Sequence, residues 1–389
     1  MLYFSKGMTS PTPGPESVGR ILINHLVDLT SISNEVEFFF VTDKIYSNNF
    51  KGKIFSYLNS VIPLPEVPIL SFEWENFLSS KTLKNLCNVL KPDLVHIHGR
   101  AGYYPAPPKG YPSLVTFHEF PPMTVYDDFS FGPSKILLNS WLKRGKMIRM
   151  KRIPDYDHFH ALSSEIALFL KASGIANSKI HLIPNGTLKT PRSVNKEYFK
   201  KKFKRILGLS DNSKILTMVG TISYHKGIHF IKRCIPELPT NYHLVLVGSS
   251  TKFIGHQYLR AILKGKHSHR IHYVGYQSPN VIYSILNASD CFLSLSISEA
   301  CQLSLLEAVS TGIPVIITEC GAAKDIFGSD YYFLLPTYPN IKLLRDKIVE
   351  IVENGSKFQN IKINIKSWKD VAIMMKKLYF SIKTEEFIE

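Results

Sequence analysis

The stretch of residues 294–318 constrains the fold more than any other part of the sequence. It reads as the end of a buried strand, a loop, a helix and a second buried strand. The helix is predicted by apolar residues at helical spacing, Leu303, Leu306 and Val309. Gly312 and Pro314 end it, and the apolar run that follows is typical of a strand buried on both faces of a parallel sheet. This strand–helix–strand unit predicts an α/β fold.

The same alternation of apolar runs and helical segments continues through the second half of the chain. Five runs are predicted strands, at residues 214–220, 243–248, 270–275, 290–295 and 313–318. Strands that recur roughly every 20–30 residues with helices between them indicate a doubly wound parallel sheet with right-handed crossovers. We therefore expect one α/β domain here.

The first half shows a looser version of this pattern. Predicted strands lie at the N-terminus and at residues 35–42, 91–100, 111–119 and 155–162, with a closing segment at 179–186 and a helix from about Ser17. A chain of 389 residues accommodates two domains of ordinary size. The polar segment 187–212, with a helix around 195–207, is the predicted connection. An amphipathic helix capped by Ser367 is expected near the end.

The net charge of +16 favours acidic partners. The sequence has no zinc-finger, helix-turn-helix or RNP signature, and its basic residues are spread along the chain, so no nucleic acid is predicted. An anionic membrane surface or a phosphorylated small molecule fits better. Residues 135–152 would form a basic amphipathic helix that can lie on an anionic bilayer, although an ordinary surface helix has the same pattern.

Cysteine and hydropathy patterns predict a soluble, cytoplasmic chain, with the inner membrane face as a place of peripheral contact. The five cysteines form no C-x-x-C pair, which favours reduced, packed thiols over disulfides or a metal site. No apolar run approaches the roughly 18 residues of a membrane-spanning helix. The N-terminal apolar segment is too short for a signal peptide. A content of 44% hydrophobic residues indicates a folded chain.

Two carboxylates, Glu299 and Glu307, bracket the first half of the 294–318 unit. A helix N-terminus there would offer unpaired N–H groups to a phosphate, and carboxylates accept hydrogen bonds from sugar hydroxyls. Open α/β sheets bind ligands at the carboxyl ends of their strands. A nucleotide sugar would satisfy all of these groups at once. The alternative is a surface glutamate before a helix and another on its solvent face.

Glu299-x7-Glu307 followed by Ala308-x3-Gly312-x-Pro314 is similar to the signature of retaining GT-B glycosyltransferases of the family 4 type. The resemblance extends over nearly the whole chain. The family usually has Gly-Phe-Gly after the first glutamate, where this chain has residues 300–302, Ala-Cys-Gln. We expect these larger side chains to narrow the approach to the phosphate and hexose.

The resemblance also implies a diphosphate site around Gly220 and Lys226. The family usually places an arginine after the first glycine, but this chain has Thr221, so Arg20, His225 or Lys324 would have to substitute. In all, the donor is expected to contact Gly14, Gly220, Thr221, Lys226, Val274, Tyr276, Glu299, Ala300, Cys301, Gln302, Leu303 and Glu307. Gly14 lies in a loop that resembles a Gly-Gly pair, with Pro15 in the second place.

Two strand-end segments of the first half resemble the family's Asp-x-x-His-x-His and Thr-x-His segments, and they end at His98 and His118. The resemblance implies that His118 contacts the donor hexose near the reacting centre. The alternative for a histidine at the end of a strand is a hydrogen bond to a neighbouring carbonyl.

The family resemblance implies a GT-B fold, with two Rossmann-like domains whose parallel sheets face across a cleft. Residues 1–190 with helix 367–389 would form the acceptor-side domain, and residues 191–366 the donor domain. The implied activity is hexose transfer from a nucleotide-diphosphate sugar, with retention, without a metal or other cofactor. Glu299, Lys226 and His118 would be catalytic. The acceptor, a lipid, glycan or protein, stays open.

Two other functions are compatible with the same residues. A catalytically weak or inactive relative would serve as a sugar-nucleotide or membrane-surface binding module, and Thr221, Pro15 and the Ala-Cys-Gln run favour it. A sugar-nucleotide epimerase or phosphorylase of the same fold is the other. The Glu-x7-Glu context favours a transferase over both.

Overall fold

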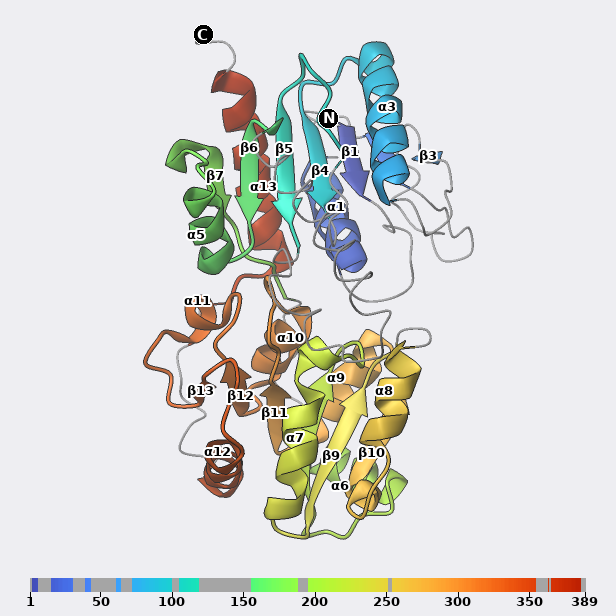
Figure 1. The fold of residues 1–389 in the computed structure, drawn as a ribbon, viewed down its shortest axis with the longest axis vertical. Coiled ribbons are helices and arrows are strands. Elements are labelled where there is room, and N and C mark those ends of the chain that lie inside the picture. Colours follow the sequence, from blue (N-terminus) through green and yellow to red (C-terminus); the bar gives the residue numbers. More distant parts are fainter. Residues whose placement is uncertain are drawn as a thin grey trace, which may run out of the picture. The chain divides into compact units, whose positions relative to one another are not determined.

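A computed structural model of the chain describes residues 2–5, 15–30, 39–42, 61–63, 72–99, 105–118, 155–187, 195–250, 254–354, 363 and 365–385. The chain divides into two compact units. Unit 1 is Met1–Gly186 with Lys366–Glu389, and unit 2 is Thr187–Ile365. Each unit contains one parallel sheet with helices packed on it (Figure 1).

The sheet of unit 1 has seven strands in the order β3-β2-β1-β4-β5-β6-β7. They are β1 (Leu2–Ser5), β2 (Phe39–Thr42), β3 (Val61–Pro63), β4 (Val95–Gly99), β5 (Ser113–Phe117), β6 (His158–Ala161) and β7 (Ile180–Leu182). All of the pairings are parallel. The strands predicted in the first half are confirmed. The short edge strand β3 was not predicted.

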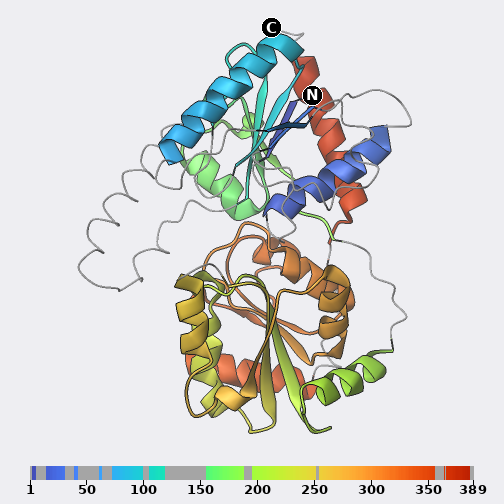
Figure 2. The ribbon, with the colours of Figure 1, turned by 90° about the vertical axis from the view of Figure 1, so that its right-hand side faces the viewer.

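Four helices are described in unit 1: α1 (Pro15–Thr30), α3 (Phe72–Leu90), α5 (Ser164–Ala172) and α13 (Trp368–Glu385). Ser367 caps α13 as predicted. Its hydroxyl accepts from the N–H of Asp370 at 3.2 Å, and the Asp370 carboxylate accepts from the N–H of Ser367 at 3.0 Å. Figure 2 shows α13 lying beside α1, so the last helix of the chain packs onto the first.

The sheet of unit 2 has six strands in the order β10-β9-β8-β11-β12-β13. They are β8 (Lys214–Val219), β9 (Tyr242–Val247), β10 (Ile271–Gly275), β11 (Cys291–Ser294), β12 (Val315–Thr318) and β13 (Leu334–Leu335). The five predicted strands are confirmed, and the two-residue edge strand β13 was not predicted. The helices are α6 (Lys196–Ile206), α7 (Ile228–Cys234), α8 (Ile254–Ile262), α9 (Pro279–Ala288), α10 (Leu303–Thr311), α11 (Ala323–Phe327) and α12 (Ile341–Asn354).

Helix α6 differs from the connecting segment expected at residues 187–212. It packs on α9 and belongs to unit 2. Lys200 on α6 forms an ion pair of 2.5 Å with Asp290, whose other oxygen accepts from the N–H of Ile215 on β8 at 2.7 Å. A charged helix sequence looks like a linker, but these long-range contacts fix it to the sheet.

The strand order of unit 2 reverses direction between β8 and β11. Successive strands run β8, β9, β10 to one side of the sheet, and β11, β12, β13 to the other. The loops that leave neighbouring strands at such a switch point diverge, and ligands bind in the space between them. Here these are the loops that follow Val219 and Ser294.

The helices that the structure describes include none that is long and apolar enough to cross a bilayer. Of the five cysteines, Cys87, Cys234, Cys291 and Cys301 are buried, which agrees with the predicted packed thiols.

Candidate functional site

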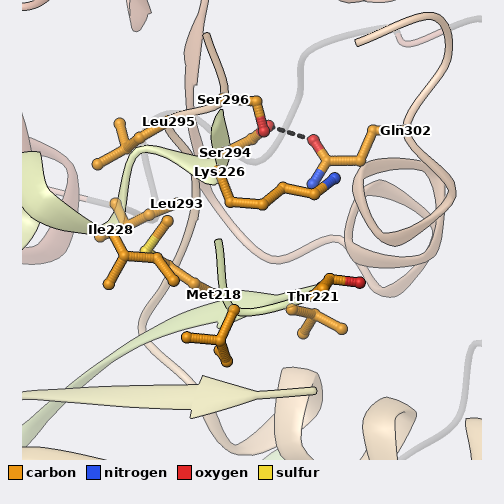
Figure 3. A pocket seen from close by; sticks show the side chains of 12 residues that line it. Met218, Thr221, Lys226, Ile228, Leu293, Ser294, Leu295, Ser296 and Gln302 are labelled. Atoms are coloured by element: carbon orange, nitrogen blue, oxygen red, sulfur yellow. Dashed lines mark hydrogen bonds between the residues drawn. The ribbon is translucent and has the colours of Figure 1, made fainter. Parts of the chain in front are cut away.

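A small pocket opens at the switch point of unit 2 (Figure 3). Its walls come from the carboxyl ends of β8 and β11, the segment that follows β8, and the start of α10. The residues that line it are Met218, Val219, Gly220, Thr221, Ile222, Lys226, Ile228, Leu293, Ser294, Leu295, Ser296 and Gln302. Four of them, Gly220, Thr221, Lys226 and Gln302, are predicted donor-binding residues.

Lys226 is held in the pocket by the glycine that follows it. Gly227 has a left-handed φ of 69°, and a Cβ atom there would lie 1.8 Å from the carbonyl oxygen of Leu295. Only glycine permits this close approach of the two loops. The N–H of Ile297 also donates to the carbonyl of His225 at 2.7 Å. The lysine is therefore fixed against the loop that carries Glu299.

Lys226 and Glu299 form an ion pair. Oε1 of Glu299 accepts from the Lys226 ammonium and, at 2.8 Å, from the Ser296 hydroxyl. The two side chains are only 17% and 16% exposed. Burial disfavours the charged form of Glu299, but attraction to Lys226 and His225 and hydrogen bonds from Lys226 and Ser296 outweigh it, so the pKa of Glu299 lies below its ordinary value. The carboxylate is therefore ionised at neutral pH.

The three cations that were expected to replace the missing arginine have different outcomes. Burial, followed by repulsion from Lys226, lowers the pKa of His225 to about 4, so this ring is neutral at pH 7. Lys324 forms an ion pair with Glu319 and is half-exposed. The side chain of Arg20 lies outside the described residues. The structure thus places one cation, Lys226, in the lining of the described pocket.

The side chains at positions 300–302 are buried. Gln302, at the N-cap position of α10, accepts from the Ser294 hydroxyl at 2.5 Å and donates to the Ser304 hydroxyl at 3.0 Å. Ser304 in turn donates to the carbonyl of Val219 at 2.8 Å. Gln302 therefore links β11, α10 and β8, a structural role that the sequence did not suggest. Figure 3 shows its amide bonded to Ser294 beside the end of Lys226.

Gly321 supports the Glu299 loop from the other side. Its φ is 56°, and a Cβ atom there would lie 2.5 Å from the carbonyl oxygen of Glu299 and 2.7 Å from that of Ala300. Ser296 and Gly321 were both missed by sequence reasoning. No local pattern indicates the serine, because the Ser-x-x-Glu capping box joins each side chain to a backbone N–H and not to the other side chain. No local pattern indicates Gly321 either.

Helix α10 carries Leu303 at its start and Glu307 one turn further on. Leu303 is half-buried. Burial raises the pKa of Glu307 to about 7. A carboxyl group desolvated in this way has a strong tendency to accept hydrogen bonds from a ligand, and such shifts are concentrated at functional sites.

Val274 and Tyr276, two of the predicted donor contacts, lie at the end of β10. The carbonyl of Val274 accepts from the Gln277 side-chain amide at 2.7 Å, and the Tyr276 ring is 46% exposed. Neither residue is among those lining the pocket at the β8–β11 switch.

His118 belongs to unit 1 and is buried at the end of β5. Its Nε2 lies 2.6 Å from Nδ1 of His98, so the partner described here is a second ring and not the carbonyl of the alternative interpretation. Burial, followed by repulsion from His160, lowers the pKa of His118 to about 3. A neutral ring can donate or accept a hydrogen bond but adds no charge to a site. Gly14 lies outside the described residues.

A chain of buried hydrogen bonds crosses the sheet of unit 1, and we call it the histidine chain. It joins Tyr379 on α13, His96 on β4, Thr116 on β5, His160 on β6 and the carbonyl of Ile183, with heavy-atom distances of 2.9, 2.7, 2.8 and 2.7 Å in that order.

The polarity of the histidine chain follows from its last acceptor. The carbonyl of Ile183 can only accept, so Nε2 of His160 carries a proton. Burial lowers the pKa of His160 to about 4, so its Nδ1 is bare and accepts from the Thr116 hydroxyl. Thr116 then accepts from Nε2 of His96, and the bare Nδ1 of His96 accepts from Tyr379. Each hydroxyl or ring N–H hydrogen of the histidine chain is therefore donated to the next group in the chain.

Two family models match the chain. The model "Glycosyltransferase Family 4" matches residues 35–187, and the model "Glycosyl transferases group 1" matches residues 199–368. Together they span most of the sequence, one in each unit.

Two curated relatives and a solved structure are similar to the chain. An uncharacterized glycosyltransferase of Methanocaldococcus jannaschii is 23% identical over 184 residues, so the chain spans about half of that relative's length, 46% of each protein. An Escherichia coli enzyme named UDP-Gal:alpha-D-GlcNAc-diphosphoundecaprenol alpha-1,3-galactosyltransferase is 27% identical over 78% of each chain. Sucrose-phosphate synthase of Thermosynechococcus elongatus has a TM-score of 0.73 at 16% identity over 99% of each chain.

The fold and the two model matches agree with one another. Two parallel α/β sheets are present, and the fold similarity to the solved structure extends over 99% of both chains. The chain therefore belongs to the GT-B glycosyltransferases of the family 4 type.

Proposed function

We propose that this protein is a retaining glycosyltransferase that moves a hexose from a nucleotide-diphosphate sugar to an acceptor hydroxyl without a metal. The observation that carries the proposal is the pairing of Lys226 with Glu299 beside the start of α10. A cation, a carboxylate and helix N–H groups are the three kinds of group that a sugar diphosphate needs.

Each group has a proposed role. Lys226 and the N–H groups at the start of α10 would neutralise the diphosphate as it leaves. Glu299 would accept hydrogen bonds from the hexose hydroxyls, and Glu307 from the ribose hydroxyls. Burial of Glu307, which raises its pKa to about 7, supports this role because a ribose hydroxyl would restore a lost hydrogen bond. His118 would act as a neutral hydrogen-bonding group toward the hexose.

The transfer step follows the chemistry of retention. The bond between the anomeric carbon and the diphosphate oxygen breaks, and its electron pair leaves with the diphosphate. The acceptor oxygen forms its bond to the same face of that carbon, and its proton passes to the departing diphosphate oxygen. No protein nucleophile is needed in this step, so the protein contributes positioning and charge stabilisation.

A lipid-linked acceptor is the class we propose. The relative from Escherichia coli is named for a sugar on diphosphoundecaprenol, a lipid carrier. The net charge of +16 and the basic segment 135–152 would favour an anionic membrane surface, where such a carrier resides. That segment lies outside the described residues.

The second candidate function is a binding module that retains the nucleotide sugar but turns it over weakly or not at all. Thr221 occupies the place of an arginine, and the neighbouring His225 is neutral at pH 7, so one cation of the usual pair is missing. Loss of one charged hydrogen bond corresponds to about 1.5–3 kcal/mol. We expect that loss to lower the rate without abolishing it.

The two functions are separated by one experiment. Purified protein is mixed with UDP-, GDP-, ADP- and dTDP-sugars, and both thermal stability and release of the nucleoside diphosphate are followed. A ligand at a hundred times its dissociation constant adds about 2.7 kcal/mol to the folded state. We expect one donor to stabilise the wild type but not Lys226→Ala, with Lys347→Ala on α12 as the matched control.

Stabilisation together with transfer to undecaprenyl-diphosphate-linked GlcNAc supports the transferase. Stabilisation without release of nucleoside diphosphate, even with acceptor present, supports the binding module. The absence of a shift with every nucleotide would contradict both.

A further inference from the structure

We propose that Lys226 exchanges its partner Glu299 for the donor diphosphate in each turnover, and that this exchange makes the pocket reject the nucleoside diphosphate once the sugar has left. The inference rests on the proposed function, because it assumes that a nucleotide sugar binds at this pocket.

The first observation is that the pocket has one cation and that a carboxylate already uses it. Lys226 donates to Oε1 of Glu299, and the other residues that line the described pocket are neutral. Position 221 is a threonine and His225 is neutral at pH 7. A diphosphate that enters the pocket therefore competes with Glu299 for the same ammonium group.

The second observation is what Glu299 keeps when Lys226 turns to a phosphate. Its Oε1 retains the Ser296 hydroxyl at 2.8 Å, a single neutral donor for a carboxylate that is only 16% exposed. A carboxylate that loses its cation in such surroundings is strongly destabilised unless new donors arrive. The hydroxyls of a bound hexose are such donors.

The two ligands therefore differ in their effect on Glu299. A nucleotide sugar binds Lys226 through its diphosphate and donates hydrogen bonds from its hexose hydroxyls to the Glu299 carboxylate. A nucleoside diphosphate binds Lys226 in the same way but has no hexose to donate to Glu299. After transfer, the most stable arrangement is Lys226 back on Glu299, which releases the diphosphate. Glu299 would thus weaken binding of the nucleoside diphosphate product and strengthen binding of the nucleotide sugar substrate.

The test is a calorimetric measurement of the dissociation constants of UDP and UDP-glucose, with the ADP and GDP pairs measured in the same way. In Glu299→Gln the amide cannot hold Lys226 as a counter-ion. We expect this variant to bind the nucleoside diphosphate about tenfold more tightly than the wild type, because the diphosphate no longer has to displace a charge-assisted hydrogen bond between Glu299 and Lys226. Its affinity for the matching nucleotide sugar should stay level or fall.

A second variant moves the affinity in the opposite direction. Ser296→Ala removes the other donor to Glu299, so the carboxylate depends more strongly on Lys226. We expect it to bind the nucleoside diphosphate a few-fold more weakly. When Glu299→Gln is combined with Lys226→Met, it should no longer increase the affinity for the nucleoside diphosphate. Glu237→Gln is the matched control. It removes a carboxylate that lies 3.7 Å from the Arg345 guanidinium, and it should change the dissociation constant of neither ligand.

Failure of this inference is distinct from failure of the proposed function. If the wild type binds none of the nucleotides, the donor site is wrong and the inference is overturned with it. If the nucleotides bind but Glu299→Gln weakens the diphosphate and the sugar nucleotide equally, or leaves the diphosphate unchanged, the function stands and the exchange is wrong. If Glu299→Gln folds poorly, Ser296→Ala provides the test. Weaker binding of the nucleoside diphosphate would support the exchange, and unchanged or tighter binding would contradict it.

Discussion

The histidine chain of unit 1 and the Lys226–Glu299 pair of unit 2 are both clusters of polar groups within a parallel α/β sheet. In unit 1 the groups are neutral, lie on three neighbouring strands and α13, and bond in one direction from Tyr379 to the carbonyl of Ile183. In unit 2 the groups are ionised, lie on two loops, and retain about one-sixth of their side-chain exposure.

The difference separates a structural network from a candidate binding site. A chain in which every hydrogen is directed to an acceptor has nothing to offer a ligand, and it stabilises the packing of α13 on the sheet. An ion pair between two chain segments can exchange one partner for a ligand group when the ligand also supplies new donors to the carboxylate that loses its cation. The predictions below test this contrast, in decreasing order of expected effect.

Acid should affect the buried histidines of unit 1, those of the histidine chain and the His98–His118 pair beside it, before it affects the ion pair. Burial holds the pKa of His118 at about 3 and that of His160 at about 4, and it holds those of His96 and His98 well below the usual 6.5. Below pH 6.5 the unfolded chain binds protons that the folded chain does not, so stability is complete above that pH and is lost as the pH falls toward 4. Each histidine contributes roughly 1.4 kcal/mol per pH unit.

Tryptophan fluorescence measures this loss selectively, because all three tryptophans of the sequence belong to unit 1. We expect the urea midpoint followed by fluorescence to fall steeply between pH 6.5 and 5. Over the same range Glu299 stays ionised, because its pKa lies below the ordinary value of 4.5. A midpoint that is level down to pH 5 would contradict the neutral state of the chain.

Lys226→Met tests the charged cluster. We expect turnover to fall by roughly 10²–10³-fold, the usual effect of removing one group that stabilises a leaving charge. The fluorescence-detected stability of unit 1 should be unchanged. Steady-state kinetics, with the donor that the stability screen selects, gives the first value, and urea denaturation gives the second. A loss of unit 1 stability equal to the loss of activity would show that the lysine is structural.

Thr116→Val tests the histidine chain at its centre. The substitution removes the acceptor of His96 and the donor of His160 in one step, and each buried group left without a partner destabilises the protein by about 1–3 kcal/mol. Thr217→Val on β8 is the matched control, because its partner Ser289 keeps a bond of 2.7 Å to the carbonyl of Ile285. We expect the control to be clearly milder in urea denaturation. Equal destabilisation by Thr116→Val and Thr217→Val would show that the histidine chain stabilises the protein no more than an ordinary buried hydroxyl pair does.

Tyr379→Phe tests the end of the histidine chain and should have the smallest effect. Only the donor to Nδ1 of His96 is lost, so we expect about 1 kcal/mol of destabilisation in the fluorescence-detected transition. Tyr331→Phe removes a comparable hydroxyl, bonded at 2.7 Å to the carbonyl of Val315 in unit 2, and should not move that transition. A larger shift in the control than in Tyr379→Phe would contradict the assignment.

The sequence predicted the repeating elements well, because their signals are local. Periodic apolar residues located β8–β12 and α10, and the serine cap of α13 was visible as a residue type in place. The edge strands β3 and β13 were missed because three and two residues form no pattern.

The candidate site was predicted only in part, because its contacts join distant segments. Glu299 and Lys226 were each identified, but their pairing across 73 positions was not. His225 was considered as a cation, whereas burial and the charge of Lys226 keep it neutral. The link formed by Gln302 and the close approach of Gly321 to the Glu299 backbone also depend on tertiary structure that no local spacing encodes.

The placement of α13 in unit 1 has a consequence for synthesis of the protein. Unit 2 is one continuous stretch, Thr187–Ile365, whereas unit 1 is completed by a helix encoded after all of unit 2. During translation unit 2 can finish folding first, although domains ordinarily fold from the N-terminus onward. Until the segment that carries Trp368 and Tyr379 has left the ribosome, the surface of unit 1 beside α1 stays uncovered and is open to chaperones or to the α13 of a second chain.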